Sequence, residues 1–101
     1  MPKKALSLLG MARRAGKITY QEDSNLAAIR NGQAQLLILA IDAGTAVAKK
    51  YRNKCLTYHV PIIENITKDD LGLALGTAPR AAVTILDEGF AKRFRELLTN
   101  E

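Results

Sequence analysis

The sequence has 101 residues, of which 48% are hydrophobic and 25% charged, and its formal net charge is +5. This length excludes a two-domain enzyme and predicts one domain, residues 1–101, that folds around a single core. The longest apolar run has six residues, which excludes a membrane span, and the first residues lack the pattern of a signal peptide. Since Cys55 is the only cysteine, an internal disulfide is excluded, and we expect a soluble protein of the reducing cytoplasm.

The charged side chains are unevenly distributed along the chain. Residues 1–54 hold ten basic and three acidic side chains, a net charge of +7, whereas residues 55–101 hold five and seven, a net charge of −2. A domain with one strongly positive side attracts polyanions, which favours nucleic-acid binding. The alternative is that scattered surface lysines merely keep a small protein in solution.

The first fifth of the chain predicts a helix, a short strand and the beginning of a second helix. Residues 3–14 repeat small and apolar side chains at helical spacing, and residues 17–19 follow as a short strand. Thr19 and Glu22 have the spacing of a capping box, which predicts a helix over residues 20–31.

A continuous apolar run marks the centre of the expected sheet. Residues 36–41 are too few for a separate buried helix, so they predict a central strand that is covered on both faces. Residues 42–45 form the loop after it, and the next helix extends to about Tyr58. Residues 60–63 contain a proline, which places them at a strand start or on an edge strand.

The last third of the chain continues the alternation. Thr67 with Asp70 indicates the start of a short helix, which Gly76 ends. Residues 81–86 predict a fourth strand, and Asp87 caps the last helix. The sequence therefore predicts an α/β fold, a three-layer α-β-α sandwich with a small mixed four-stranded sheet.

Residues with catalytic or metal-binding chemistry are few. The only histidine, His59, and the two serines, Ser7 and Ser24, lie in no catalytic motif. Cys55 lies on the apolar stripe of its helix, which predicts a buried thiol. One cysteine and one histidine cannot supply the usual ligands of a metal, and the glycines form no phosphate-binding loop. We expect no enzyme activity, no metal and no cofactor.

The second predicted helix carries the candidate binding residues. Its first backbone N–H groups and nearby polar side chains offer hydrogen bonds to a nucleic acid. These side chains belong to Lys17, Gln21, Asp23 and Ser24. Asp23, Ala27 and Arg30 share one helix face at i, i+4 and i+7, where a small residue between two polar ones allows close approach. The same face is equally well explained as an ordinary solvent-exposed surface.

Several segments occur in an order that resembles one known family. Residues 8–17, residues 28–32, the apolar strand that ends in Asp42 and Ala43, and residues 71–79 with their two glycines and a proline carry the likeness. They resemble the ribosomal-protein family of kink-turn RNA binders, whose members include the archaeal large-subunit protein seven-Ae. The opening segment and residues 87–92 are similar to its bacterial YlxQ-like branch. The resemblance covers about residues 4–98 and implies a sandwich fold that binds folded RNA without catalysis.

The resemblance also implies positions for the RNA contacts. In the family, a Gly-x-Asn-Glu-x-x-Lys motif opens the second helix and contacts the tandem G·A pairs of the kink. These roles fall on Gln21, Asp23, Ser24 and Ala27, none of which keeps the family residue. Ala27 cannot neutralise a phosphate, and the carboxylate of Asp23 repels one. The second family contact is the loop before the last strand, which is residues 77–80 here.

The sequence thus predicts a ribosomal-type RNA-binding domain for structured, kink-turn-like RNA, associated with the ribosome or translation and monomeric. One side of the expected site comprises Lys17, Gln21, Asp23, Ser24, Ala27 and Arg30, and the other comprises Asp42, Ala43, Thr77, Ala78, Pro79 and Arg80. In this prediction Lys17 and Arg30 supply the phosphate contacts of the missing lysine. The alternative is a protein-interaction module of the same fold, which docks on a ribosomal or transcription factor without direct RNA contact.

Overall fold

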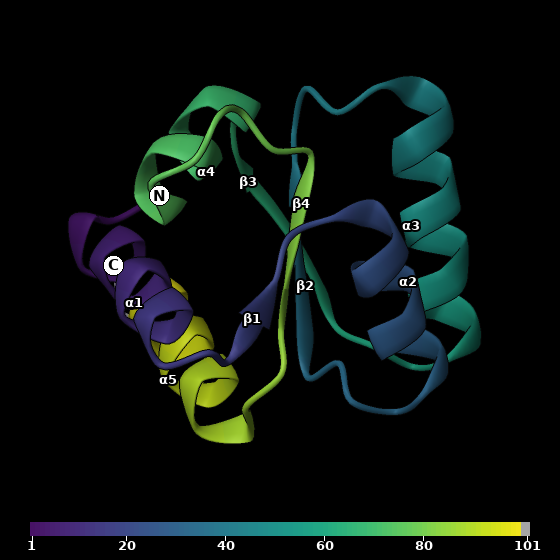
Figure 1. Ribbon diagram of the computed structural model, residues 1–101, viewed down its shortest axis with the longest axis horizontal. Helices are drawn as coiled ribbons and strands as arrows, with labels where there is room; N and C mark the ends of the chain where they lie inside the picture. The colour runs from purple at the N-terminus through teal and green to yellow at the C-terminus, as the bar shows by residue number, and fades with distance from the viewer. Residues whose placement is uncertain (100–101) are drawn as a thin grey trace.

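The computed structural model describes residues 1–99, in which five helices alternate with four strands (Figure 1). The helices are α1 (Lys3–Arg14), α2 (Glu22–Arg30), α3 (Thr45–Thr57), α4 (Lys68–Leu75) and α5 (Glu88–Thr99). The strands are β1 (Ile18–Thr19), β2 (Leu36–Ala40), β3 (Ile62–Ile66) and β4 (Ala82–Ile85). The predicted order of elements is therefore confirmed. Each helix in this part of the chain is too short or too polar to traverse a lipid bilayer.

The four strands form one mixed sheet in the order β1-β4-β2-β3. β2 pairs with β3 in parallel, and β4 is antiparallel to both of its neighbours, β1 and β2. Figure 1 shows α1, α4 and α5 on one face of this sheet and α2 with α3 on the other. The predicted three-layer α-β-α sandwich is therefore confirmed.

The central strand β2 joins two hydrophobic clusters. Leu36 and Ile38 pack in a cluster with side chains of α1, α4 and α5, whereas Leu37 and Leu39 pack in a second cluster with side chains of α2 and α3. All five residues of β2 are buried. Because successive side chains of a strand point to opposite faces, a strand covered on both sides must be apolar throughout. The prediction for residues 36–41 is thus confirmed for its first five residues, whereas Ile41 lies beyond the strand and is 59% exposed.

Two of the predicted helix caps are confirmed. The Thr67 hydroxyl oxygen accepts a hydrogen bond from the Asp70 N–H (3.2 Å), and the Asp87 carboxylate accepts one from the Phe90 N–H (2.9 Å). Each oxygen satisfies an N–H group that has no partner within its helix. Gly76 follows α4 with φ of 75°, a left-handed conformation that favours glycine.

The predicted capping box of α2 is wrong. Thr19 lies in β1, and the residue before α2 is Gln21, which makes no side-chain capping bond. The Thr19 hydroxyl instead donates a hydrogen bond to the Asn25 side chain. The third strand also differs, because it spans Ile62–Ile66 rather than residues 60–63.

The connections lie at two opposite ends of the sheet, the upper and the lower end in Figure 1. The upper end, where β2 and β3 end and β4 begins, holds the connections β1–α2, β2–α3, β3–α4 and α4–β4. The lower end holds the connections α1–β1, α2–β2, α3–β3 and β4–α5. At the lower end the Leu86 N–H donates a hydrogen bond to the Lys17 carbonyl, and the Gln35 N–H donates one to the Ile85 carbonyl. Both donor–acceptor distances are 2.8 Å.

Candidate nucleic-acid interface

Three predicted parts of the site meet at the upper end of the sheet. They are the start of α2, the loop after β2 with Asp42 and Ala43, and the loop of residues 77–80 before β4. The Asp42 carboxylate accepts a hydrogen bond from the Lys68 N–H (2.8 Å), and the Lys68 carbonyl accepts one from the Arg80 N–H (3.2 Å). The backbone of Lys68 therefore ties the two loops to each other.

A shallow pocket of about 250 Å³ separates α2, α3 and the loop before β4. Its walls are formed by Tyr20, Gln21, Glu22, Val47, Tyr51, Pro79, Arg80, Ala81 and Ala82. Three of the sequence-predicted site residues, Gln21, Pro79 and Arg80, thus line one cavity. Asp23 and Ser24 are exposed on α2 outside it.

The loop before β4 is ordered by its own polar groups. The Thr77 hydroxyl donates a hydrogen bond to the Ala78 carbonyl (2.8 Å) and accepts one from the Arg80 Nε–H (3.4 Å). Gly72 of α4 lies directly beneath this loop, because a Cβ atom there would be 2.8 Å from the Pro79 Cα. The loop therefore packs against α4 so closely that position 72 has no space for a residue larger than glycine.

Two guanidinium groups lie over the ring of Tyr20 at the mouth of this pocket. The guanidinium carbons of Arg80 and Arg13 are 4.8 Å and 5.6 Å from the ring centre. Arg13 also donates a hydrogen bond to the Leu75 carbonyl at the end of α4 (2.5 Å). Within residues 1–99 neither arginine forms an ion pair. Such cation–π contacts hold the two charges in place while leaving them available to an anion.

Arg13 and Tyr20 were absent from the predicted site. Arg13 belongs to the segment that carried the family resemblance, and Tyr20 is adjacent to Gln21, yet neither lies in the motif that opens α2. α1, β1 and the loop before β4 come together only in the folded chain. The spacing of residues along the sequence therefore does not predict the contacts of Arg13 and Arg80 with Tyr20.

A buried amide fixes the position of α2. The Asn25 side chain is 0% exposed, accepts hydrogen bonds from the hydroxyls of Thr19 (2.6 Å) and Thr84 (2.8 Å), and donates to the Tyr51 hydroxyl (3.1 Å) and the Ala82 carbonyl (3.4 Å). Two donors and two acceptors exhaust the capacity of an amide. Burial raises the pKa of the Tyr51 hydroxyl. This network has no signal in the sequence, because an asparagine inside a helix is ordinarily exposed.

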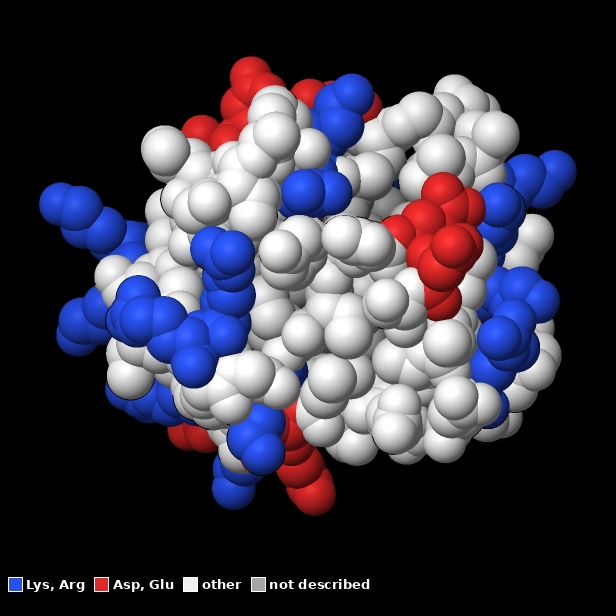
Figure 2. All heavy atoms as spheres, in the orientation of Figure 1, with Lys and Arg blue, Asp and Glu red and all other residues white. Residues whose placement is uncertain are grey.

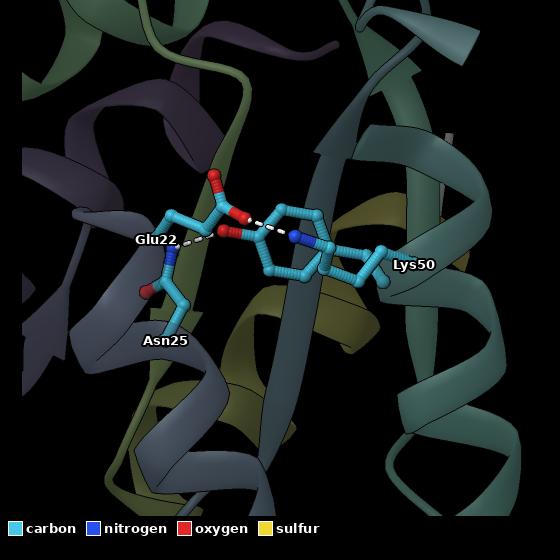
Figure 3. A network of polar contacts seen from close by, with 4 residues as sticks. Glu22, Asn25 and Lys50 are labelled. Carbon is cyan, nitrogen blue, oxygen red and sulfur yellow. Dashed lines mark hydrogen bonds and ion pairs between the residues drawn. The ribbon is translucent and has the colours of Figure 1, made fainter. Parts of the chain in front are cut away.

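An exposed ion pair lies beside the pocket (Figure 3). The Lys50 ammonium of α3 is 2.8 Å from the Glu22 carboxylate of α2, and this hydrogen bond raises the pKa of Lys50. Figure 3 shows the pair in front of the buried Asn25 contact. The Glu22 charge at the pocket wall is thus compensated by a neighbouring cation.

Lys17 and Arg30 lie at the lower end, away from this pocket. The Lys17 carbonyl is bonded to Leu86 beyond the end of β4, and Arg30 ends α2, roughly 12 Å along the helix axis from Glu22. The expected helix face of Asp23, Ala27 and Arg30 exists, but it runs along α2 toward the lower end. Lys17 and Arg30 therefore do not line this pocket, whereas Arg80 lines it and Arg13 and Lys50 contact its lining residues Tyr20 and Glu22.

The surface charge follows the helices. Figure 2 shows Lys and Arg side chains over α1 and α5 on one side and over α3 on the other, with a mostly uncharged strip between them. A group of acidic side chains lies over the beginning of α2, between this strip and the cations of α3. The front face therefore has two positive flanks that are separated by the pocket and the edge of the sheet.

Cys55 is buried in the cluster beneath α3, as its stripe predicted. Burial raises the pKa of its thiol to about 11, so the reactive thiolate is disfavoured in the folded chain. Among the residues described, no group of His, Cys, Asp and Glu side chains has a metal-binding arrangement.

The amino-acid sequence is similar to known sequences over almost its whole length. Residues 3–95 match the model of the ribosomal protein L7Ae/L30e/S12e/Gadd45 family. RNA-binding protein YlxQ of Enterococcus faecium is 38% identical over 96 residues, which cover 95% of this chain and 92% of that protein. RNA-binding protein YlxQ of Bacillus subtilis (strain 168) is 40% identical over 91 residues, covering 90% and 91%. Large ribosomal subunit protein eL8 of Thermoplasma volcanium is 33% identical over 88 residues, covering 86% and 73%.

Solved structures share the fold. A protein of unknown function from Bacillus halodurans C has a TM-score of 0.91 at 36% identity, covering 97% of this chain and 99% of that one. The Giardia lamblia 15.5kD RNA binding protein has a TM-score of 0.81 at 20% identity, covering 99% and 89%, which supports the fold alone. The family match, the identities and the shared fold agree that the chain belongs to the ribosomal protein L7Ae/L30e/S12e/Gadd45 family, in its YlxQ-like branch.

Proposed function

We propose that the chain binds kinked RNA at the upper end of its sheet and acts there without catalysis, in association with the ribosome or translation. The observation that carries this proposal is the placement of the Arg13 and Arg80 guanidinium groups over Tyr20, beside a pocket at the start of α2. Two relatives at 38% and 40% identity are named RNA-binding proteins, which supports the same conclusion.

Arg13 and Arg80 supply the phosphate contacts. A guanidinium group binds phosphate through two parallel hydrogen bonds, and a kinked RNA brings phosphates of its two strands close together. The first N–H groups of α2 add donors at the positive end of the helix dipole. These groups replace the lysine that the family motif has at the position of Ala27. The Asp23 carboxylate repels phosphate, so the RNA backbone approaches from the side of Arg80.

The pocket accepts a base that has left the helical stack. Its walls include the rings of Tyr20 and Tyr51 and the amide of Gln21, which offer a stacking surface and hydrogen bonds. The loop of residues 77–80 contributes Pro79 and Arg80 to its wall, and the backbone of Lys68 joins this loop to Asp42. Because a regular duplex keeps its bases stacked, this arrangement favours distorted RNA over a straight helix.

A salt titration tests the proposal. Binding of a kink-turn RNA and of a straight duplex of the same composition is measured by fluorescence anisotropy at several salt concentrations, for the natural chain, Arg80→Gln and Arg13→Gln. Each lost phosphate contact is expected to lower the slope of log affinity against log salt by about 0.7 to 0.9. Arg93→Gln on α5 is the matched control and retains the slope. Absence of binding at low salt, or equal slopes for Arg80→Gln and Arg93→Gln, contradicts the proposal.

A second candidate function is docking on a protein partner. A mostly apolar groove of about 400 Å³ between α1 and α5 favours it, since Met11 in this groove is 50% exposed and the groove wall also includes Leu8 and Leu97. Lys3, Lys4 and Arg93 line the same groove, so its charge fits an acidic amphipathic helix of a ribosomal or transcription factor. A ribonuclease-resistant complex with such a purified factor that Met11→Glu abolishes supports this function. Loss of every complex after ribonuclease treatment contradicts it.

A further inference from the structure

A second pocket, of about 420 Å³, lies at the lower end of the sheet, opposite the proposed RNA site. It is enclosed by α5 and by the connections α2–β2 and α3–β3. The lining residues are Ala34, Gln35, His59, Pro61, Glu88, Ala91, Lys92 and Arg95. Its volume is within the range of small-molecule sites in proteins. None of its residues belongs to the proposed RNA interface, so its chemistry requires a separate explanation.

The wall contributed by α5 has two cations and one acid. Lys92 and Arg95 are three residues apart, so their side chains share a helix face, and neither forms an ion pair among residues 1–99. Glu88 lies roughly 10 Å along the helix axis from Arg95. Lys92 lies one turn from Glu88 on the same helix face, so the Arg95 end of this wall offers donors to an anion and the Glu88 end offers an acceptor to hydroxyl or amino groups.

The opposite wall offers a flat ring and small apolar surfaces. His59 is the one non-glycine residue with positive φ in the described chain, at 58°, and Gly32 of the α2–β2 connection has φ of 76°. The following Val60 N–H donates to the Cys55 carbonyl (2.9 Å), which anchors this turn to the end of α3. Pro61 follows directly, and Ala34 and Ala91 complete the apolar lining. A planar base has room to stack here, with the Gln35 amide within the same pocket.

We propose that this lower pocket binds a nucleotide. The phosphate lies against Lys92 and Arg95, the base lies against His59 and Pro61, and ribose hydroxyls or an amino group of the base donate to Glu88. The two sources of this chemistry are a free mononucleotide and a nucleotide unit of an RNA strand. This assignment does not depend on the proposed function of the upper end.

Two cations outside the pocket extend the positive surface at the lower end. The backbones of Lys17 and Gln35 are bonded to opposite sides of the end of β4. They are therefore two strand spacings apart, a distance of about 10 Å. Arg30 ends α2 just before the connection that leads to Gln35. An RNA strand that enters the pocket would therefore continue over Lys17 or Arg30. The placement of these two cations, far from the upper pocket, is then explained by a second contact.

An NMR titration of the full chain tests the assignment. ¹⁵N-labelled protein receives 5′-AMP, a short single-stranded RNA, or inorganic phosphate, and signals of Gln35, His59 and Ala91 are followed. We expect both AMP and RNA to shift these signals, and Arg95→Gln to weaken binding about tenfold, because a hydrogen bond to a charged group is lost. Arg93→Gln is the matched control, since Arg93 is on the same helix but lines the α1/α5 groove.

The outcomes distinguish a free nucleotide from a unit of RNA, and they distinguish binding at the lower pocket from binding at the upper end of the sheet. Binding of AMP that Arg95→Gln weakens supports a site for a free nucleotide, whether or not RNA also binds, and binding of RNA without AMP, with the same dependence on Arg95, supports a unit of RNA. No shift with AMP or RNA, or equal affinities for Arg95→Gln and Arg93→Gln, overturns the assignment, as does a response to inorganic phosphate that leaves His59 unchanged. Arg80→Gln is expected to keep these shifts. Its loss of kink-turn RNA binding therefore reports on the upper end alone.

Discussion

The side-chain amide of Asn25 donates a 3.1 Å hydrogen bond to the hydroxyl of Tyr51, which joins α2 to α3 behind the upper pocket (Figure 3). Both residues are 2% exposed or less. Because the same amide also bonds to β1 and β4, four elements meet at one polar group. A satisfied buried network of this kind specifies one arrangement of its elements, since any other leaves polar groups without partners. The walls of the upper pocket are therefore held in place before a ligand arrives.

Asn25→Ala is expected to destabilise the fold by roughly 2 to 4 kcal/mol, because it leaves several buried polar groups without a partner. Tyr51→Phe removes a single acceptor and is expected to cost about 1 kcal/mol. Urea unfolding followed by circular dichroism measures both changes. Asn53→Ala, at an exposed asparagine of α3, is the control and leaves the midpoint unchanged. Equal midpoints for the Asn25 and Asn53 variants would contradict the structural role of the network.

Gly72→Ala is expected to damage the loop before β4. The added Cβ would contact the Ala78 carbonyl oxygen and lie 2.7 Å from its carbon and 2.8 Å from the Pro79 Cα, so the loop has to move. Overpacking of this kind costs about 1 to 3 kcal/mol, and the displacement of Arg80 lowers affinity for kinked RNA. Thermal unfolding and the anisotropy titration measure the two effects. Gly44→Ala is the matched control, since no atom lies within 4 Å of the added Cβ there. A Gly72 variant that behaves like the Gly44 variant contradicts the close contact.

Tyr20→Ala is expected to weaken RNA binding about tenfold at fixed salt, because it removes the ring that positions two guanidinium groups and offers a stacking surface. Tyr20→Phe keeps the ring and is expected to bind as the natural chain does. The anisotropy titration compares both variants with the same kink-turn RNA. Equal losses for the two variants would show that the hydroxyl, rather than the ring, makes the contact.

The layers of this fold were predictable because the spacing of apolar residues along the sequence indicates which faces of each helix and strand are buried. Residues 36–40 of the apolar run have no polar face, so only a strand between two helical layers accommodates them. Thr67 and Asp87 were recognised as caps because their spacing to the bonded N–H groups is local. The predicted cap at Thr19 is wrong because the Thr19 hydroxyl donates a hydrogen bond to the buried Asn25 side chain. The capping preference of threonine gives no information about such a tertiary partner.

The residues of the upper pocket were less predictable than the fold. Gln21 was predicted from the start of the second helix, and Pro79 and Arg80 through the family resemblance; all three line one pocket. Lys17 and Arg30 were predicted from charge and helix face, but a face runs the whole length of a helix, whereas the upper pocket lies at one end of α2. The contacts of Arg13 with Tyr20 and Leu75 join residues from distant segments. Only the packing of α1 against α4 brings these groups together, so one-dimensional patterns could not reveal them.

Alkaline pH is expected to destabilise the chain through Cys55. Burial raises the pKa of its thiol from 9.0 to about 11, so the unfolded chain releases the proton at a lower pH than the folded chain. The contribution of the neutral thiol to stability is complete below pH 9 and falls as the pH rises toward 11, by roughly 2 kcal/mol. Urea unfolding across this range compares the natural chain with Cys55→Ala, which keeps Tyr51 and the other titrating residues, although the pKa of Tyr51 loses the small raising effect of the Cys55 charge. The stability difference between the two proteins is expected to narrow as the pH rises. Parallel stability curves would mean that the thiol titrates alike in both states, and that the cluster beneath α3 admits water.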